Sequence, residues 1–556
     1  MRRPPNVVLV ITDDQGYGDL GCHGNTVIKT PNLDKLYLQS VRLTNFHVCP
    51  TCAPTRASLM TGRYCNRTGV WHTVMGRSLL RSDEVTMADL FAANGYRTGI
   101  FGKWHLGDNY PFRPQDRGFQ EVLVHGGGGV GQTPDYWGND YFDDTYWHNG
   151  KPKKFAGYCT DVWFNEALKF IEESADRPFF CYLSTNAPHW PYNVADKYVK
   201  LYKGKDRVPN GKFYGMITNI DDNVGQLLKK LKDLRLEWQT VLIFMTDNGT
   251  AEGWRDEKGY NAGMRGIKGS EYDGGHRVPC FIRWLGGGLG RGKDVVTITA
   301  HIDLLPTLIE LCRLQGPEGV KFDGKSLMGV LFGRDADWPE RIVITDSQRV
   351  DHPEKWRKSA VMTDRWRLIN GKRLYDMKAN PGQKKNLGDE HPKVVEKLRK
   401  AYEQWWTDIS KRFDEYCEIV IGSDKENASR LTCHDWHSPN IPWNQDTIRS
   451  AVRANGSWAV EVARDGTYEF VLRRWPEELD LPITKTICGG KAISAVKARL
   501  KIADVDLRKP VQRDATGAAF RVNLKAGKTR LQTWFTDDKG NSRGAYYVYV
   551  KRFTQS

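Results

Sequence analysis

The chain has 556 residues, of which 40% are apolar and 27% charged, and its 82 Lys and Arg outnumber 67 Asp and Glu, giving a net charge of +15. A chain of this length has room for about two to four domains, and its composition excludes a mainly disordered or collagen-like protein. No stretch approaches the roughly 18 apolar residues that a membrane-spanning helix requires, so we expect no membrane span.

Four continuous apolar runs have the pattern of strands that are buried on both faces, and they cover residues 6–12, 96–101, 179–184 and 240–246. Between them, residues 161–173 and 216–234 have the apolar spacing of amphipathic helices. This alternation predicts an α/β fold with a mostly parallel central sheet flanked by helices. Ligands of such sheets collect beyond the carboxyl ends of the strands.

The pattern changes after about residue 340. Short strand-like runs come first, followed by a helix at about 392–409, and from 413 onward alternating strands dominate. Runs near 458–462, 468–472, 519–524 and 545–550 are separated by turn residues at Asp465-Gly466, Ala526-Gly527 and 538–540. They predict a hairpin-rich, sandwich-like β module. We therefore divide the chain into a catalytic α/β domain (1–340), a smaller α+β subdomain (341–412) and an accessory β-rich domain (413–556).

The positive charge favours an anionic partner but is not clustered. Residues 413–556 contribute +5 and residues 1–412 contribute +10. Nucleic-acid binding usually requires a basic patch or stripe, so this distribution argues against a nucleic-acid partner.

The chain has an odd number of cysteines, eleven, and is large enough to fold without a disulfide framework. No hydrophobic signal segment follows Met1. The sequence therefore predicts either a cytoplasmic protein or one given without its export signal.

Two of the predicted strands end in adjacent oxygen ligands. Asp13 and Asp14 follow the first strand, and Asp247 and Asn248 follow the run at 240–246. Asp and Asn after a strand can simply start turns. Two such pairs on two buried strands, however, favour a site for a hard divalent cation.

Cys52 lies at the predicted start of a helix, because Pro54 is typical of the first helical turn. Backbone N–H groups there favour an anion, and Arg56 lies one turn further on the same face. From the residues alone, Cys52 is either half of a redox-active pair with Cys49 or a small buried residue.

The segment from Cys52 to Arg56, with Leu59, Thr61 and Gly62 behind it, resembles the C-x-P-x-R signature of type I sulfatases. Thr55 stands where that family most often has Ser. The resemblance extends over roughly residues 5–412, and its landmarks come in the family's order: Asp13, Asp14, Lys103, His105, His189, Asp247, Asn248, Lys268 and the segment 374–387. It implies the alkaline-phosphatase-like α/β fold and hydrolysis of sulfate esters, most plausibly on a sulfated carbohydrate or an aryl sulfate.

The resemblance also implies cofactors. In the family the cysteine is oxidised to formylglycine by a formylglycine-generating or anaerobic maturation enzyme, and the aldehyde hydrate is the nucleophile. Calcium would be bound by Asp13, Asp14, Asp247, Asn248 and the modified Cys52. The family also favours a periplasmic or secreted location.

The family's roles can be carried over residue by residue. Arg56 and Lys103 would stabilise the hydrate, and Lys268 would bind the sulfate. Asp247 would accept the proton of the attacking hydroxyl, His189 would protonate the leaving oxygen, and His105 would take the proton that releases the sulfate.

Two alternatives stay open. A phosphomonoesterase, phosphodiesterase or phosphonate hydrolase could use the same scaffold, and the chain could be a carbohydrate-binding protein with an inactive enzyme domain. Some of the tryptophans in the catalytic region could stack on a sugar, and we expect most of them to serve in packing: Trp71, Trp104, Trp137, Trp147, Trp190 and Trp254. Candidates to line the substrate pocket are Arg77, Arg81, Arg113, His125, Asp135, Arg265 and His276.

Overall fold

A ten-stranded mixed sheet forms the centre of the protein, which we describe from a computed structural model for residues 3–334 and 338–553. Its strands lie in the order β13 (Asp294–Val295), β2 (Val41–Leu43), β12 (Cys280–Arg283), β9 (Thr240–Thr246), β1 (Asn6–Thr12), β8 (Phe179–Ser184), β4 (Arg97–Gly102), β5 (Glu121–Val124), β6 (Thr145–His148) and β7 (Lys151–Lys154). The five strands from β9 to β5 are parallel, whereas β12, β6 and β7 run antiparallel to their neighbours. The predicted α/β class is thus confirmed.

Strand β1 lies in the middle of this sheet, and all seven of its residues are buried. Its side chains alternate between two cores. Val7 and Leu9 face the core that contains α2 (Cys52–Thr61), α3 (Met87–Ala93) and α8 (Leu304–Cys312). Val8 and Val10 face the core that contains α1 (Pro31–Leu38), α4 (Cys159–Glu173) and α6 (Gly211–Asp233). A strand that is covered on both faces needs an unbroken apolar sequence, which β1 has.

Most predicted elements lie within a few residues of their observed bounds, but α6 begins five residues earlier than predicted. The side chain of Asn210 accepts hydrogen bonds from the backbone N–H groups of Lys212 and Phe213 and so caps the helix. The glycines Gly211 and Gly215 obscured this start in the sequence, because glycine disfavours helix interiors.

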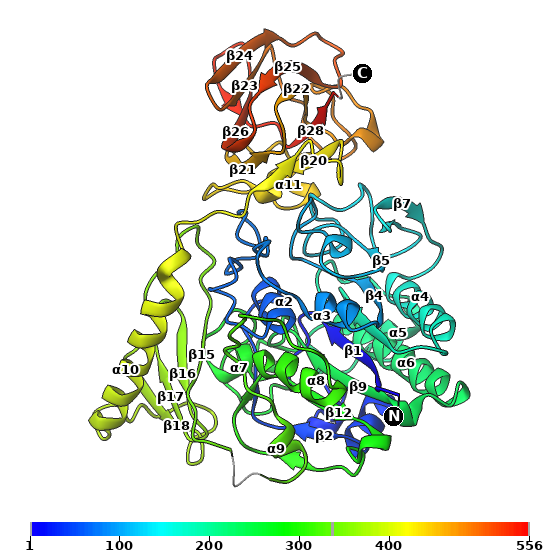
Figure 1. The fold of residues 1–556 in the computed structure, drawn as a ribbon, viewed down its shortest axis with the longest axis vertical. Helices are drawn as coiled ribbons and strands as arrows, with labels where there is room; N and C mark the ends of the chain where they lie inside the picture. Colours follow the sequence, from blue (N-terminus) through cyan, green and yellow to red (C-terminus); the bar gives the residue numbers. More distant parts are fainter. Residues whose placement is uncertain (1–2, 335–337, 554–556) are drawn as a thin grey trace.

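A second, antiparallel sheet follows along the chain, with β15 (Val343–Asp346), β16 (Ser359–Met362), β17 (Trp366–Ile369) and β18 (Arg373–Asp376). Helix α10 (Pro392–Ile409) packs against it through Leu398, Tyr402 and Trp405. Figure 1 shows this sheet and helix at one side of the central sheet.

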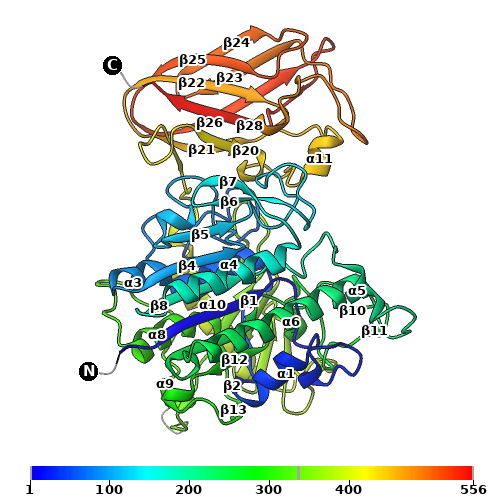
Figure 2. The same cartoon turned by 90° about the vertical axis from the view of Figure 1, so that its right-hand side faces the viewer.

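The C-terminal module (residues 413–553) is a sandwich of two sheets (Figures 1 and 2). One contains β19 (Ile419–Ile421), β21 (Ser457–Val462), β26 (Gly527–Thr536), β23 (Lys497–Ile502), β24 (Val505–Pro510) and β27 (Ser542–Arg543). The other contains β20 (Ser429–Thr432), β28 (Tyr547–Arg552), β22 (Gly466–Arg473) and β25 (Ala518–Leu524).

The predicted hairpins at Asp465-Gly466 and Ala526-Gly527 are wrong. Strand β21 pairs with β26, and β22 pairs with β25 and β28, so each of these two turns passes from one sheet to the other. Alternating apolar residues identify a strand with one buried face but do not say which strand is its neighbour. Observed hairpins join β23 to β24 and, at the predicted turn 538–540, β26 to β27.

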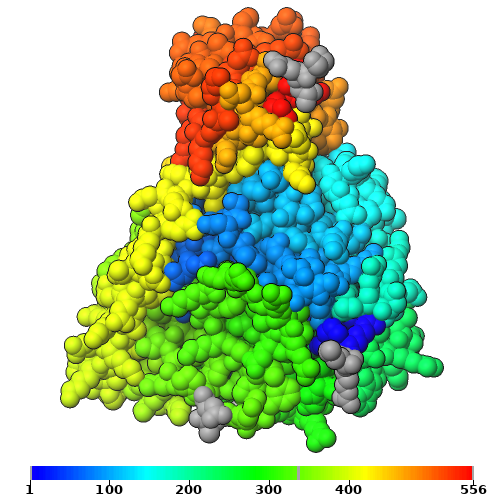
Figure 3. Space-filling view, viewed as in Figure 1, coloured from blue at the N-terminus to red at the C-terminus, as the bar shows by residue number. Residues whose placement is uncertain are grey.

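The C-terminal module is packed tightly onto the α/β region. Leu79 and Phe112 of that region belong to the module's hydrophobic core, and Trp137 packs edge-on against Trp475 with ring centroids 5.3 Å apart. In Figure 3 the orange module rests directly on the blue and cyan part of the chain. Among the described residues, we find no helix with the length and apolar composition needed to cross a membrane.

We predict that Leu9→Ala lowers the free energy of unfolding by about 2–5 kcal/mol, because Leu9 is fully buried in β1 and its removal leaves a cavity. Leu38→Ala is the matched control: Leu38 is 67% exposed, and its loss should cost less than about 0.5 kcal/mol. Denaturant unfolding followed by tryptophan fluorescence compares the two. Equal effects would contradict the packing described for β1.

Candidate active site

The polar residues predicted to form a site converge at the carboxyl ends of the central strands. Asp13 and Asp14 follow β1, Asp247 and Asn248 follow β9, and Lys103 follows β4. Helix α2 begins at Cys52 and faces them. Three possible ligand atoms, one each from Asp13, Cys52 and Asp247, lie within 4.8 Å of one another. The predicted juxtaposition of strand ends and helix start is therefore present in the fold.

Three cations compensate three carboxylates in this buried cluster. Lys103 Nζ lies 2.5 Å from Asp13 Oδ2, and Arg56 Nη2 lies 2.9 Å from Asp247 Oδ2. Lys268 Nζ lies 2.6 Å from Asp14 Oδ1. The six charges cancel when all three carboxylates are ionised.

The oxygen atoms of the cluster suit a hard cation. Asp13 Oδ1 and Asn248 Oδ1 are buried and have no hydrogen-bond partner among the described residues. Buried polar atoms are normally paired, so two unpaired oxygens in one cluster of carboxylates point to a missing positive ligand. Asp14 has a φ of 67°, a backbone conformation that Asp tolerates better than most residues and that is often found at functional sites.

Burial and neighbouring charges shift the pKa values of this cluster. Burial and the adjacent Asp13 raise the pKa of Asp247 to about 7. Burial alone would raise the pKa of Asp14, but Lys268 and His189 outweigh it and hold that pKa well below its usual range. Burial raises the pKa of the Cys52 thiol, which keeps unmodified Cys52 protonated near neutral pH and a poor nucleophile.

The two candidate histidines each present one nitrogen without a proton. His105 Nε2 donates to the carbonyl of Thr73 at 2.9 Å, so its buried Nδ1 is a bare acceptor. His189 Nδ1 donates to the carbonyl of Trp190 at 2.6 Å, which directs its Nε2 toward Asp14 Oδ2, 3.8 Å away. Burial lowers the pKa of His189 to about 3, with Lys268 adding to the shift.

Cys49 does not pair with Cys52. Its Sγ lies 3.6 Å from Cys65 Sγ and 3.5 Å from His301 Nε2, whereas Cys52 groups with Asp13 and Asp247. This geometry contradicts the interpretation of Cys49 and Cys52 as a redox-active pair.

Two residues expected to line the substrate pocket make contacts toward the C-terminal module. Arg77 binds Asp351 and the carbonyl of Glu415, and Arg81 binds the Glu415 carboxylate. These contacts tie the α/β region to the start of the C-terminal module, and the place of both residues in the pocket stays a prediction.

The other five pocket candidates also make contacts within the protein, although His125 Nε2 is buried without a hydrogen-bond partner among the described residues, and their place in the pocket stays a prediction. Arg113 binds Asp116 and Glu426, Arg265 binds the carbonyl of Gln383, His125 binds the carbonyl of Gly126, Asp135 accepts from Gly126 and Gly131, and His276 contacts His47.

His47, Asp273 and His276 form a second buried cluster of possible metal ligands. The guanidinium group of Arg367 already lies 3.0 Å from Asp273 Oδ1 and 3.1 Å from His47 Nε2. A cation at this position compensates the carboxylate, so the cluster has the arrangement of a structural ion pair.

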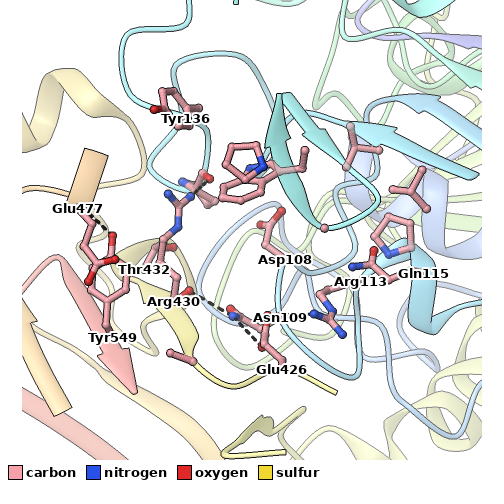
Figure 4. Close-up of a pocket in the computed structure, with 18 of the residues that line it drawn as sticks. Asp108, Asn109, Arg113, Gln115, Tyr136, Glu426, Arg430, Thr432, Glu477 and Tyr549 are labelled. Carbon is pink, nitrogen blue, oxygen red and sulfur yellow. Dashed lines mark hydrogen bonds and ion pairs between the residues drawn. The ribbon is translucent and has the colours of Figure 1, made fainter. Parts of the chain in front are cut away.

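A cavity of about 560 Å³ lies between the α/β region and the C-terminal module (Figure 4). Two ion pairs lie in its lining: Arg113 contacts Glu426, and Arg430 contacts Glu478. None of the predicted catalytic or metal-binding residues lines it. Its position and its ion pairs indicate that it belongs to the interface between the α/β region and the C-terminal module.

The family model described as Sulfatase matches residues 5–313, more than half of the chain. The chain belongs to the sulfatase family. Human arylsulfatase A is 33% identical to this sulfatase over 363 residues, which cover 60% of this chain and 68% of that protein. The N-acetylgalactosamine-6-O-sulfatase of Bacteroides thetaiotaomicron is 29% identical over 500 residues, covering 72% of this chain and 92% of that one.

Solved structures agree with this assignment. The crystal structure of Ps i-CgsB in complex with k-i-k-neocarrahexaose matches this sulfatase with a TM-score of 0.67 and 26% identity, covering 75% of this chain and 95% of that one. The predicted type I sulfatase of the alkaline-phosphatase-like superfamily is confirmed, and with it the reaction class: the protein is a sulfuric ester hydrolase.

A glycine run forms a wall of this sulfatase's site that the sequence only hinted at. A Cβ on Gly128 would lie 2.3 Å from the His105 ring, and one on Gly129 would lie 3.3 Å from His189 Nδ1. Glycines have no side chain, so the run 126–129 permits close backbone approach. Its contacts with His105 and His189 were not predicted, because these residues lie about 20 and 60 residues away along the chain.

We predict that Gly128→Ala lowers kcat/KM for sulfate esters by about 100-fold, because the added methyl group must displace His105. Gly211→Ala is the control: a Cβ there would lie 3.6 Å from Tyr202 Cβ, an ordinary contact. Sulfate release and thermal unfolding are measured for both variants. An unchanged kcat/KM in Gly128→Ala would show that His105 does not need its observed position.

Proposed function

We propose that this sulfatase hydrolyses the sulfate ester of a sulfated carbohydrate, with a calcium ion and a formylglycine formed from Cys52. The observation that carries the proposal is the convergence of Cys52 with Asp13 and Asp247. The carbohydrate assignment is supported by the relatives, whose names include N-acetylgalactosamine-6-O-sulfatase and a structure in complex with neocarrahexaose.

The residues that would hold calcium are Asp13, Asp14, Asp247 and Asn248, together with the modified Cys52. The unpaired oxygens of Asp13 and Asn248 support this assignment. Bound calcium supplies Lewis acidity toward a sulfate oxygen and the nucleophile. Lys103 and Lys268 contact Asp13 and Asp14, so both ammonium groups lie beside the residues that would hold the ion.

The matured side chain at position 52 supplies an aldehyde hydrate as the nucleophile toward sulfur. Its place at the N-terminus of α2 puts it among backbone N–H groups that favour negative charge. Arg56 is fully buried and held by Asp247 and Ser184, so its guanidinium group stays in a fixed orientation beside residue 52. Fixed cations around developing negative charge lower the barrier without reorganising during the reaction.

Three groups handle protons. Asp247 accepts the proton of the attacking hydroxyl. His105 presents its bare Nδ1 as the second base, and His189 protonates the leaving oxygen through Nε2. The negative charge of a bound sulfate ester would raise the pKa of His189 from its low value and favour this protonated form.

Two alternatives are weaker. A phosphate or phosphonate esterase of this scaffold could use the same cations, but plain phosphatases do not need a cysteine in C-x-P-x-R. An inactive carbohydrate-binding protein would have no need to bury three cations against three carboxylates, an arrangement that is costly unless every charge is compensated.

The division into a catalytic domain (1–340), a subdomain (341–412) and an accessory domain (413–556) remains our proposal. So does the partner that modifies Cys52. Because Cys52 is only 2% exposed, a maturation enzyme must reach it before α2 packs onto the sheet.

We predict that mass spectrometry of the peptide containing Cys52 detects the loss of sulfur and two hydrogens and the gain of one oxygen after co-expression with a maturation enzyme. Cys52→Ala should lower sulfate release about a thousandfold or more, since the nucleophile is lost. Cys49→Ala is the control and should keep most of the activity. Unmodified Cys52 in a protein that is fully active on sulfate esters would refute the proposed nucleophile.

We predict that removing calcium with a chelator abolishes activity and lowers the midpoint of thermal unfolding. Calcium at 100 times its Kd should stabilise the native state by about 2.7 kcal/mol, because it binds the folded site alone. Asn248→Ala should weaken this stabilisation. Identical unfolding with calcium and with chelator would exclude calcium at this site, whatever the activity.

A further inference from the structure

Two tryptophans from distant parts of the chain lie together beside His189. Trp190 follows His189 directly and is 41% exposed, and Trp443 comes from the C-terminal module and is 37% exposed. Their ring centroids are 6.4 Å apart, at an interplanar angle of 64°. Burial of large aromatic side chains is strongly favourable, so a pair left this exposed points to a binding surface.

Trp443 is more exposed than the other tryptophans of the C-terminal module, of which Trp534 is half-buried. Trp436, Trp458 and Trp475 of the same module are completely buried. Trp443 instead lies just before α11 (Gln445–Arg449), whose first turn is capped by the side chain of Asn444. Figures 1 and 2 show α11 at the base of the module, where it meets the α/β region.

The backbone that carries Trp443 is fixed to the α/β region on both sides. The carbonyls of Pro442 and Trp443 accept hydrogen bonds from Thr133 Oγ1 and Thr133 N at 2.7 and 3.0 Å. The N–H group of Gln445 donates to the carbonyl of Gly131 at 3.0 Å. A ligand that stacks on this indole therefore pays little entropy for ordering the protein.

One turn connects Thr133, which binds the backbone of Trp443, to the glycine that lies against His189. Gln132 N donates to Gly129 O, which closes the turn from Gly129 to Thr133. At one end, Gly129 lies against His189; at the other, Thr133 holds Trp443. The position of Trp443 relative to His189 is thus set by a single short segment.

We propose that Trp190 and Trp443 form a stacking subsite for a pyranose ring of the substrate, so that the C-terminal module completes the binding site. Aromatic faces pack on the apolar faces of sugar rings, while sugar hydroxyls stay in water. This inference rests on the proposed function, in which His189 protonates the leaving oxygen. The sugar attached to that oxygen must therefore lie close to His189, and Trp190 is the next residue in the chain.

The test compares Trp443→Ala, Trp443→Phe and wild type on the sulfated oligosaccharide that the wild type hydrolyses fastest among sulfated galactans and glycosaminoglycans. Trp443→Ala should lower kcat/KM about tenfold or more, mainly through KM, and Trp443→Phe should restore most of it. Inhibition by inorganic sulfate, which reaches only the charged centre, should change less than about twofold. Trp238→Ala is the control, because Trp238 is 61% exposed and lies before β9, at the opposite end from Asp247.

Binding is measured separately, by calorimetry with the same oligosaccharide in a Cys52→Ala background. Loss of affinity on adding Trp443→Ala supports the subsite. If the wild type hydrolyses no sulfate ester, the proposed function is refuted, but this binding result still supports the subsite. Unchanged affinity and unchanged kcat/KM in Trp443→Ala would overturn the subsite and leave the sulfatase reaction standing.

Discussion

The compensation of Asp13, Asp14 and Asp247 by Lys103, Lys268 and Arg56 is the constraint on which the site depends. Three buried carboxylates repel one another, and the cluster holds together because each has a cation from a different part of the chain. Strands β1, β4 and β9 and helix α2 must therefore meet with little freedom. The fold is organised to bring opposite charges to one point at the carboxyl edge of its sheet.

Contacts around His105 connect the charged cluster to the C-terminal module. His105 is bonded to Thr73, and the nearby backbone N–H of Met75 donates to the carbonyl of His434 in the module. Leu79 and Phe112 of the α/β region complete the module's hydrophobic core. The module is therefore part of the site's scaffold, which agrees with the stacking role inferred for Trp443.

Much of the fold and of the charged cluster could be predicted from the sequence. Buried strands are visible as apolar runs, and the polar residues of the cluster follow two of these runs directly. Other features depended on partners that a single sequence does not reveal. The two strands joined at Asp465-Gly466 lie in different sheets of the sandwich, Arg77 and Arg81 bind residues of the C-terminal module, and Gly128 lies against His105. In each case the residue type was visible, but its neighbour in space was not.

The central position of β1 has a consequence for biosynthesis. This strand is made early, yet it pairs with β8 and β9, so its sheet cannot close until Thr246 has been translated. About two hundred residues separate Cys52 from that point, which at typical rates of synthesis takes about 10–40 s. During that interval the helix bearing Cys52 has no completed sheet to pack against. The order of strands would thus give the proposed maturation enzyme time to reach a thiol that the folded protein encloses.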